Sequence, residues 1–288
     1  MALRLLAVLI SLALVYTVPQ LARWRDDRWF RAWVDRLAET SGAGRVTIAL
    51  LLPVAVCAAL ASIFAAMPLL DLAWLILAVV VLAYTLGPRE LEMDIDGILK
   101  APDSVSREAA IQALRQDDQP LPYHAPTLVE AAMLAALRRR FGVLFWFFLL
   151  GPAGALFYRL AQTLGRDASM GLDATTSTAA RRFADALDWI PAHLMVFAMA
   201  LVSDFDAVIG AWREWHRRSG RPLSRLDPDF LGAVARAGVD ADVEAGDGYA
   251  HDVSDPLVEL ADTRRVVFRV LIVWLGVAAV IVVAALLA

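Results

Sequence analysis

The sequence has little cysteine, little charge and no familiar catalytic motif. Its one cysteine, Cys57, lies in an apolar run, which excludes an intrachain disulfide and a metal site built from cysteines. The net charge is −4, so no overall basic field points to nucleic acid as a partner. No Walker loop and no GxSxG, HExxH or CxxC motif occurs. The residues alone therefore predict no catalytic group, no metal and no cofactor.

Apolar residues dominate instead. They make up 59% of the 288 residues, whereas charged residues make up 20%, and the mean hydropathy is +0.58. A soluble domain is about 45–50% apolar and roughly one quarter charged, and the strands of a membrane β-barrel would alternate polar and apolar residues. The sequence therefore predicts an all-α, polytopic membrane protein with about six spans. The expected spans are residues 2–19, 46–66, 69–87, 141–164, 183–203 and 266–287.

The arginines predict how these spans are oriented. Residues 20–45, 88–140 and 204–265 carry 21 of the 27 basic residues, so the positive-inside rule places them in the cytoplasm. Both termini and the 165–182 loop then lie on the opposite side, and residues 1–288 form one integral membrane domain. Four arginines near that outer loop disagree with this arrangement: Arg159, Arg166, Arg181 and Arg182. Either segments 141–164 and 183–203 do not both cross fully, or these arginines serve a site.

Three polar segments carry local signals. In residues 22–40, Trp29, Trp33 and Leu37 share one helical face among arginines, which is typical of an amphipathic helix at the headgroup level. Residues 204–218 show a second amphipathic pattern. Thr127-x-x-Glu130 resembles a capping box that starts a helix. Residues 240–251 faintly resemble a calcium loop but lack its glycine and final glutamate, which favours a solvated acidic loop.

Two of the expected spans are interrupted by proline. Gly151-Pro152-Ala153-Gly154 lies in the fourth and Ile190-Pro191 in the fifth. Proline removes a backbone donor, and a neighbour must then satisfy the freed carbonyl inside lipid. Paired broken helices can mark a ligand site at the membrane midplane. The alternative is a pair of kinks, or close packing at small residues.

Ionisable residues at membrane depth favour a ligand site in the same region. Arg182, Asp185 and His193 share one face of the fifth segment, where Asp185 can pair with Arg181 or Arg182. We hypothesise a polar pocket that binds an anionic head group or a phosphate through arginine. Its proposed members are Tyr158, Arg159, Gln162, Asp167, Arg182, Asp185 and His193. The alternative is internal salt bridging and snorkelling, with His193 as a packed polar residue.

Several stretches resemble a known family. They are FGVLFWF at 141–147, GPAGALFYRL at 151–160, LDWIPAHL at 187–194 and GPR at 87–89. Together they resemble the AmpE family, the regulatory inner-membrane proteins of the β-lactamase induction system. This resemblance implies a non-enzymatic modulator linked to cell-wall recycling, which would bind an anionic amphiphile or a cell-wall-derived ligand. It further implies a multi-pass location in a bacterial inner membrane, with both termini in the periplasm. It also implies a protein partner in the cytoplasm or membrane, besides the lipid bilayer itself.

AmpE is related to the CobD/CbiB membrane enzymes, which attach an aminopropanol arm to a corrinoid carboxylate. Their motif matches this sequence at Thr163, Leu164, Met170, Gly171, Arg182 and Asp185. It departs at Gln162, Ala184, Asp188 and His193, which replace asparagine, aspartate, asparagine and arginine, and at Gly165-Arg166, which are extra. These losses favour the regulatory branch. A corrinoid amide-forming synthase and a small transporter of an anionic amphiphile remain the alternatives.

Overall fold

Helices form every regular element that the computed structural model describes, which confirms the all-helical class. The structure describes residues 1–17, 27–67, 70–86, 91–115, 120–220, 226–244 and 255–287. They group into two compact units. Unit 1 is Met1–Pro88, Gly142–Leu187 and Ala278–Ala288, and unit 2 is Arg89–Phe141 and Asp188–Val277.

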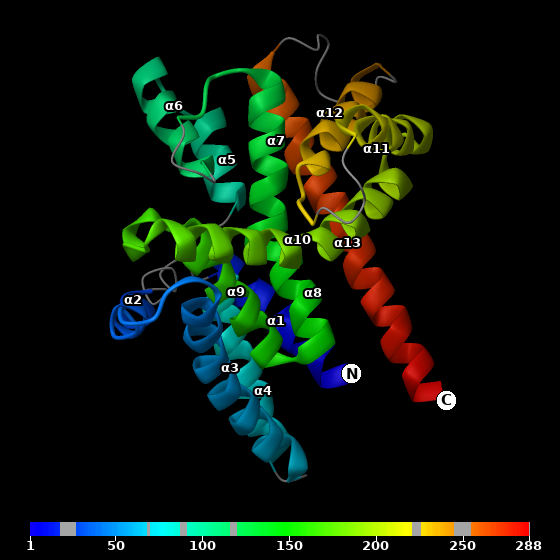
Figure 1. The fold of residues 1–288 in the computed structure, drawn as a ribbon. Coiled ribbons are helices and arrows are strands. Elements are labelled where there is room, and N and C mark those ends of the chain that lie inside the picture. The colour runs from blue at the N-terminus through cyan, green and yellow to red at the C-terminus, as the bar shows by residue number, and fades with distance from the viewer. Residues whose placement is uncertain are drawn as a thin grey trace. The chain divides into compact units, whose positions relative to one another are not determined.

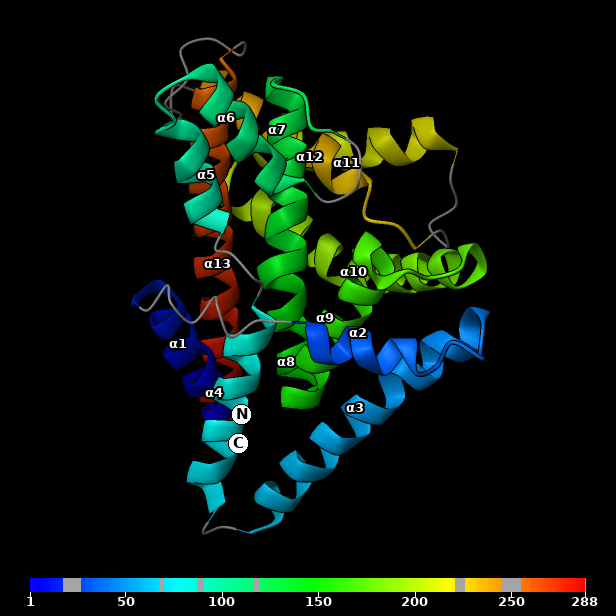
Figure 2. The same ribbon diagram turned by 90° about the vertical axis from the view of Figure 1, so that its left-hand side faces the viewer.

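Unit 1 contains most of the N-terminal helices (Figure 1). They are α1 (Ala2–Thr17), α2 (Arg28–Asp35), α3 (Gly42–Ala66), α4 (Asp71–Thr85), α8 (Gly142–Leu150), α9 (Pro152–Arg166) and the 3₁₀ turn η5 (Ala168–Met170). Helix α1 packs against α4, while α3 and α4 approach each other toward Met67 (Figure 2). Helix α10 (Ala174–Val202) begins in this unit and continues into unit 2.

Among the described residues, three helices are long and apolar enough to cross a membrane: α3, α10 and α13 (Pro256–Leu287). Two further apolar helices, Ala2–Val15 and Asp71–Thr85, are shorter. These helices match five of the expected spans and confirm a helical membrane protein. The remaining one, residues 141–164, folds differently.

The chain reverses direction at Gly151 (Figure 1). Gly151 has φ +71°, a backbone conformation that glycine adopts without strain, and Pro152 begins the next helix. Helices α8 and α9 pack against each other. A Cβ atom on Gly154 would lie 2.2 Å from the carbonyl oxygen of Trp146, so only glycine permits this approach. Residues 141–164 are therefore a helical hairpin and not one span, and Gly151, Pro152 and Gly154 form its turn.

Prolines in the membrane helices leave carbonyl groups that other residues satisfy. Pro53 lies inside α3 and has no N–H to donate to the carbonyl of Ala49, four residues earlier. Trp33 of α2 donates its indole Nε1–H to that oxygen at 3.2 Å. The contact fixes α2 on α3.

The same arrangement occurs where α8 ends. Pro152 cannot donate to the carbonyl of Phe148, and Arg4 of α1 donates to this oxygen from Nη1 at 2.6 Å. The contact ties α1 to the tip of the α8–α9 hairpin.

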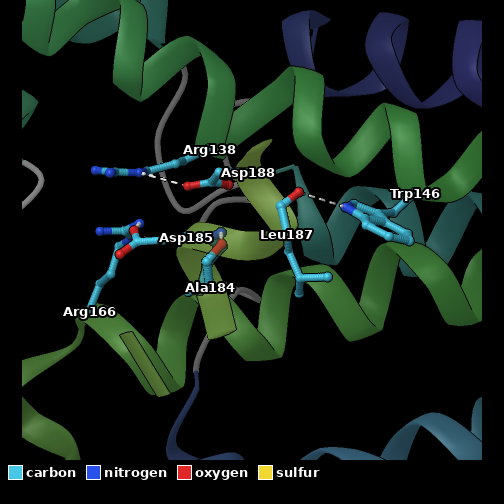
Figure 3. Close-up of polar contacts among 8 residues, drawn as sticks. Arg138, Trp146, Arg166, Ala184, Asp185, Leu187 and Asp188 are labelled. Carbon is cyan, nitrogen blue, oxygen red and sulfur yellow. Dashed lines mark hydrogen bonds and ion pairs between the residues drawn. The ribbon is translucent and has the colours of Figure 1, made fainter. Parts of the chain in front are cut away.

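A third proline lies inside α10, which stays helical through it. Pro191 leaves the carbonyl of Leu187 without its usual donor, and Trp146 of α8 donates its Nε1–H to that oxygen at 3.2 Å (Figure 3). The prediction that neighbours must satisfy the proline-freed carbonyls is thus confirmed at both interruptions. Because protein groups fill this role, the broken helices do not require a ligand.

The hairpin also changes the expected orientation of the 165–182 loop. The backbone N–H of Gly42 donates to Thr176 Oγ at 2.7 Å, and Arg31 donates to Ser169 Oγ at 3.1 Å. The loop therefore lies beside the basic segment that precedes α3, because α8 and α9 together return the chain to the side from which α8 started. The prediction that these two segments face opposite sides is wrong, and the arginines of the loop no longer disagree with the positive-inside rule.

Unit 2 contains most of α13 and the remaining helices (Figure 1). They are α5 (Leu91–Leu99), α6 (Ser104–Ile111), the 3₁₀ turn η3 (Gln112–Leu114), α7 (Ala125–Ala136), the π-helical segment η4 (Leu137–Phe141), α11 (Phe205–Ser219) and α12 (Phe230–Glu244). Helix α11 packs against α12, and α7 packs against α12 and α5.

The structure of unit 2 agrees with the predicted amphipathic helix at residues 204–218 but not with the predicted capping box. Asp204 caps α11 by accepting from the N–H of Ala207 at 2.7 Å, and this helix follows the expected amphipathic pattern. The prediction that Thr127 starts a helix with a capping box is wrong, because α7 begins at Ala125 and Thr127 already lies in its first turn. Glu130 instead pairs with Arg236 of α12 at 3.1 Å.

The calcium-like segment starts inside α12, and its residues 245–251 lie outside the described part of the chain. Within the described part, no group of three or more His, Cys, Asp or Glu side chains could hold a metal ion.

We predict that the exposed residues Glu39 and Ser177 face the cytoplasm and that Met67 faces the opposite side. Single cysteines at these three positions, in a Cys57→Ala background, would be treated with an impermeant maleimide in intact cells. Met67→Cys should react, whereas Glu39→Cys and Ser177→Cys should react only after permeabilisation. Reaction of Ser177→Cys in intact cells, without that of Glu39→Cys, would restore the full crossing of residues 141–164.

Candidate functional site

Helices α9 and α10 touch through their backbones. A Cβ atom on Gly165 would lie 2.8 Å from the carbonyl oxygen of Ala180 and 3.1 Å from Cβ of Ala184. Small residues at such an interface let two helices approach closely. The approach brings the polar side chains near the end of α9 against α10.

Four residues form what we call the α9–α10 cluster: Gln162, Arg166, Ala184 and Asp185. Arg166 Nη2 donates to Asp185 Oδ1 at 2.5 Å, and its Nε donates to Gln162 Oε1 at 2.8 Å. Gln162 Nε2 donates to the carbonyl of Ala184 at 3.3 Å. Arg166 and Asp185 face each other in Figure 3. Asp185 keeps 24% of its side chain exposed, so a ligand can reach this charged pair.

The partner of Asp185 therefore differs from the prediction. Arg182 is exposed at the surface of α10, and the cation bound to Asp185 is Arg166 from the neighbouring helix. Spacing along one helix suggested Arg181 or Arg182, but the close approach of α9 places Arg166 nearer.

Three other predicted pocket residues make none of the hydrogen bonds that define the α9–α10 cluster. Tyr158 is fully buried. Arg159 donates to Asp27 Oδ2 at 3.1 Å, away from the α9–α10 cluster's hydrogen bonds. Asp167 accepts from the backbone N–H of Ser169 at 2.9 Å and so caps the turn η5. Of the predicted residues, Gln162 and Asp185 are thus brought together, each bound to Arg166.

His193 lies in unit 2, where it packs as an aromatic residue. Its Nδ1 donates to the carbonyl of Trp189 at 2.8 Å. Its ring centroid is 4.4 Å from those of both Trp189 and Phe230. This is the packed polar residue of the alternative interpretation.

Unit 2 contains a second charged group that was not predicted from the sequence. We call it the arginine cluster: Arg138, Arg139 and Arg140 of η4, with Asp188, Asp94 and Glu92. Arg138 Nε lies 3.3 Å from Asp188 Oδ2 (Figure 3), and the Asp188 side chain is completely buried. The Arg139–Asp94 and Arg140–Glu92 pairs each measure 2.5 Å.

The π-helical segment explains how three consecutive arginines find three acids. Neighbouring positions of a helix point in clearly different directions, so the guanidinium groups reach partners on different sides. π-Helical turns occur often at functional sites, and buried ion pairs are costly unless both partners are present. The run of three arginines directly before an apolar stretch was the available signal, since charge at that depth requires partners.

Comparison with known proteins decides between the two related families. A family model described as "CobD/Cbib protein" matches residues 14–237, which is most of the chain and includes the α9–α10 cluster. The chain belongs to the CobD/CbiB family. No solved structure matches.

Two curated relatives of the CobD/CbiB family agree with this assignment. The "Cobalamin biosynthesis protein CobD" of Chromobacterium violaceum is 30% identical over 209 residues, which cover 68% of this chain and 65% of the relative. The protein of the same name from Stutzerimonas stutzeri is 31% identical over 102 residues, which cover 33% of each chain. The match thus spans just under two thirds of the first relative.

The resemblance to AmpE, and with it the regulatory role in β-lactamase induction, is therefore wrong. The family model and both relatives indicate CobD/CbiB, and none of them indicates AmpE. The GPR stretch at 87–89 lies outside the described residues. The Gly-Pro stretch forms the turn of the α8–α9 hairpin, and Pro191 of the Trp-Ile-Pro stretch leaves the Leu187 carbonyl to Trp146. Both stretches therefore indicate a shared helix scaffold and not a shared function.

The structure also explains two departures from the CobD/CbiB motif. The extra residues Gly165 and Arg166 supply the close helix approach and the cation for Asp185. Asp188, at the asparagine position, is neutralised by Arg138.

We predict energetic coupling between Arg166 and Asp185. Asp185→Ala should lower the free energy of unfolding by about 1.5–3 kcal/mol, because it leaves Arg166 without its charged partner. Adding Arg166→Ala should restore part of the loss in detergent, measured as a double-mutant cycle. The matched control is Arg182→Ala, which should show no coupling to Asp185. Additive losses for Arg166 and Asp185 would contradict the pair.

Proposed function

We propose that this protein is a corrinoid-modifying membrane synthase, similar to adenosylcobinamide-phosphate synthase. It would form an amide between a corrinoid carboxylate and the amino group of an aminopropanol arm. The observation that carries the proposal is the family match over residues 14–237, supported by relatives whose printed names refer to cobalamin biosynthesis.

The reaction requires two kinds of protein group. The carboxylate must first be activated, for example by a nucleoside triphosphate, so that one of its oxygens can leave. The amine must lose a proton to attack the acyl carbon, and a positioned carboxylate can accept it. We assign this role to Asp185, whose charge Arg166 stabilises and whose side chain remains 24% exposed.

Arg182 is the second residue that we place in the proposed site. It matches the family motif, lies one turn before Asp185 on α10 and is exposed. A guanidinium group binds carboxylate and phosphate oxygens in a bidentate manner. Arg182 is therefore suited to hold an anionic group of a substrate beside Asp185.

We further propose a multi-pass location in the bacterial inner membrane as one integral domain. Residues 20–45, 88–140 and 204–265 would face the cytoplasm, and both termini the periplasm. The hairpin adds the 165–182 loop, and thus Arg182, to the cytoplasmic side, where soluble nucleotides and corrinoids are available. With both of its ends on this side, α10 would lie along the membrane without crossing it, and α1, α3, α4 and α13 would be the spans.

Genetic complementation tests the proposed function. The gene would be expressed in a bacterium that lacks its own membrane synthase, and the corrinoids would be analysed by mass spectrometry. Wild type should restore the corrinoid that carries the aminopropanol arm. Asp185→Asn should lower its amount at least about tenfold, because a general base contributes about 10²–10⁴-fold to the rate.

The design separates activity from folding. Asparagine keeps an oxygen for Arg166 but removes the charge, and immunoblots of membranes would show equal protein. The matched control is Asp206→Asn, an exposed aspartate of α11, which should behave as wild type. Failure of the wild-type gene to restore the product, at normal membrane abundance, would refute the function. Full activity of Asp185→Asn would refute only the assigned role.

A further inference from the structure

Unit 1 contains an apolar groove of about 670 Å³, which we call the α2–α3 groove. Its walls come from α2, α3, α4 and α9. Helices α3 and α4 diverge toward α2 in Figure 2. Lining residues include Trp29, Trp33, Val56, Cys57 and Leu156. Arg36 also lines the groove and is the one charged residue among the described residues of its lining.

Hydrogen bonds hold the two indole walls in place. Trp33 donates to the Ala49 carbonyl at 3.2 Å, and Trp29 Nε1 donates to Tyr84 Oη at 3.1 Å. Both tryptophans and Arg36 lie on one face of α2 and its C-cap, at positions i, i+4 and i+7. These contacts hold the apolar walls of the groove in place, and Arg36 at the end of α2 places a positive charge beside them.

The size of the groove limits what can fill it. Small-molecule sites measure about 300–1,000 Å³, and 670 Å³ lies within this range. A helix of about 10 Å diameter fills roughly 400 Å³ per turn, so the groove would hold less than two turns, which is too little for a crossing helix of a partner. The space suits one hydrocarbon chain.

The positive charge of Arg36 indicates which head group the lipid carries. Arg36 is exposed, and α2 carries tryptophan and arginine together, which is typical of a helix at the headgroup level. We propose that the α2–α3 groove binds an anionic phospholipid of the bilayer, with one acyl chain along Val56 and Leu156 and the phosphate on Arg36. This site goes beyond the proposed synthase function and does not depend on it.

Lipid binding to the purified, delipidated full-length protein tests the proposal. Phosphatidylglycerol and phosphatidylcholine with identical acyl chains would be titrated in detergent and followed by native mass spectrometry and thermal stability. Wild type should bind phosphatidylglycerol about fivefold more tightly, as one arginine near a membrane surface implies. Arg36→Gln should abolish this preference, and Val56→Trp should remove one bound lipid of either type.

Matched controls carry the same changes away from the groove. Val80→Trp is on an exposed face of α4, and Arg213→Gln is on α11; both should behave as wild type. Equal affinity of the wild type for the two lipids would overturn the head-group assignment. Retention of the lipid by Val56→Trp, with helix content unchanged, would overturn the groove as the site. A dimer that Val56→Trp converts to a monomer would show that a second copy fills it.

Discussion

The structure of unit 1 depends on satisfying the carbonyl groups that proline leaves without a donor. A buried polar group without a partner costs about 1–3 kcal/mol in proteins, and more in an apolar medium. Lipid supplies no hydrogen-bond donor, so the donor must come from another helix. Trp33, Arg4 and Trp146 provide it. Each contact joins two different elements, so the donors also determine which helices pack together.

This constraint leads directly to the candidate site. The turn at Gly151 folds residues 141–164 into a hairpin, and the Trp146 contact places α10 on α8. Helix α9 then meets α10 closely enough for Arg166 to neutralise Asp185. A charged pair that would be costly alone in lipid becomes a partly exposed, hydrogen-bonded group that is suited to bind a polar substrate.

Much of the fold could be predicted from the sequence, because apolar length, proline chemistry and amphipathic periodicity are local properties. The partners could not, because they depend on how closely helices approach. Arg182 is close to Asp185 in the sequence. However, Gly165 lets α9 approach α10 so closely that Arg166 pairs with Asp185 instead. The sequence predicts a span at residues 141–164, where the structure has a hairpin, because a Gly-Pro turn and a kinked span share the same composition. The resemblance to AmpE was wrong for a similar reason. The stretches on which it rested determine helix packing, and related families with different functions can share them.

The central claim is that Trp146 replaces the donor that Pro191 lacks, and a double-mutant cycle between these two residues tests it most directly. The free energy of unfolding would be measured in detergent for Trp146→Phe, Pro191→Ala and the double variant. Trp146→Phe should cost about 1–3 kcal/mol in the wild-type background, because Leu187 loses its donor. It should cost clearly less in the Pro191→Ala background, where the restored backbone N–H can bind that carbonyl. The lost ring packing of Trp146 is common to both backgrounds and cancels. An equal cost in both backgrounds would contradict the account.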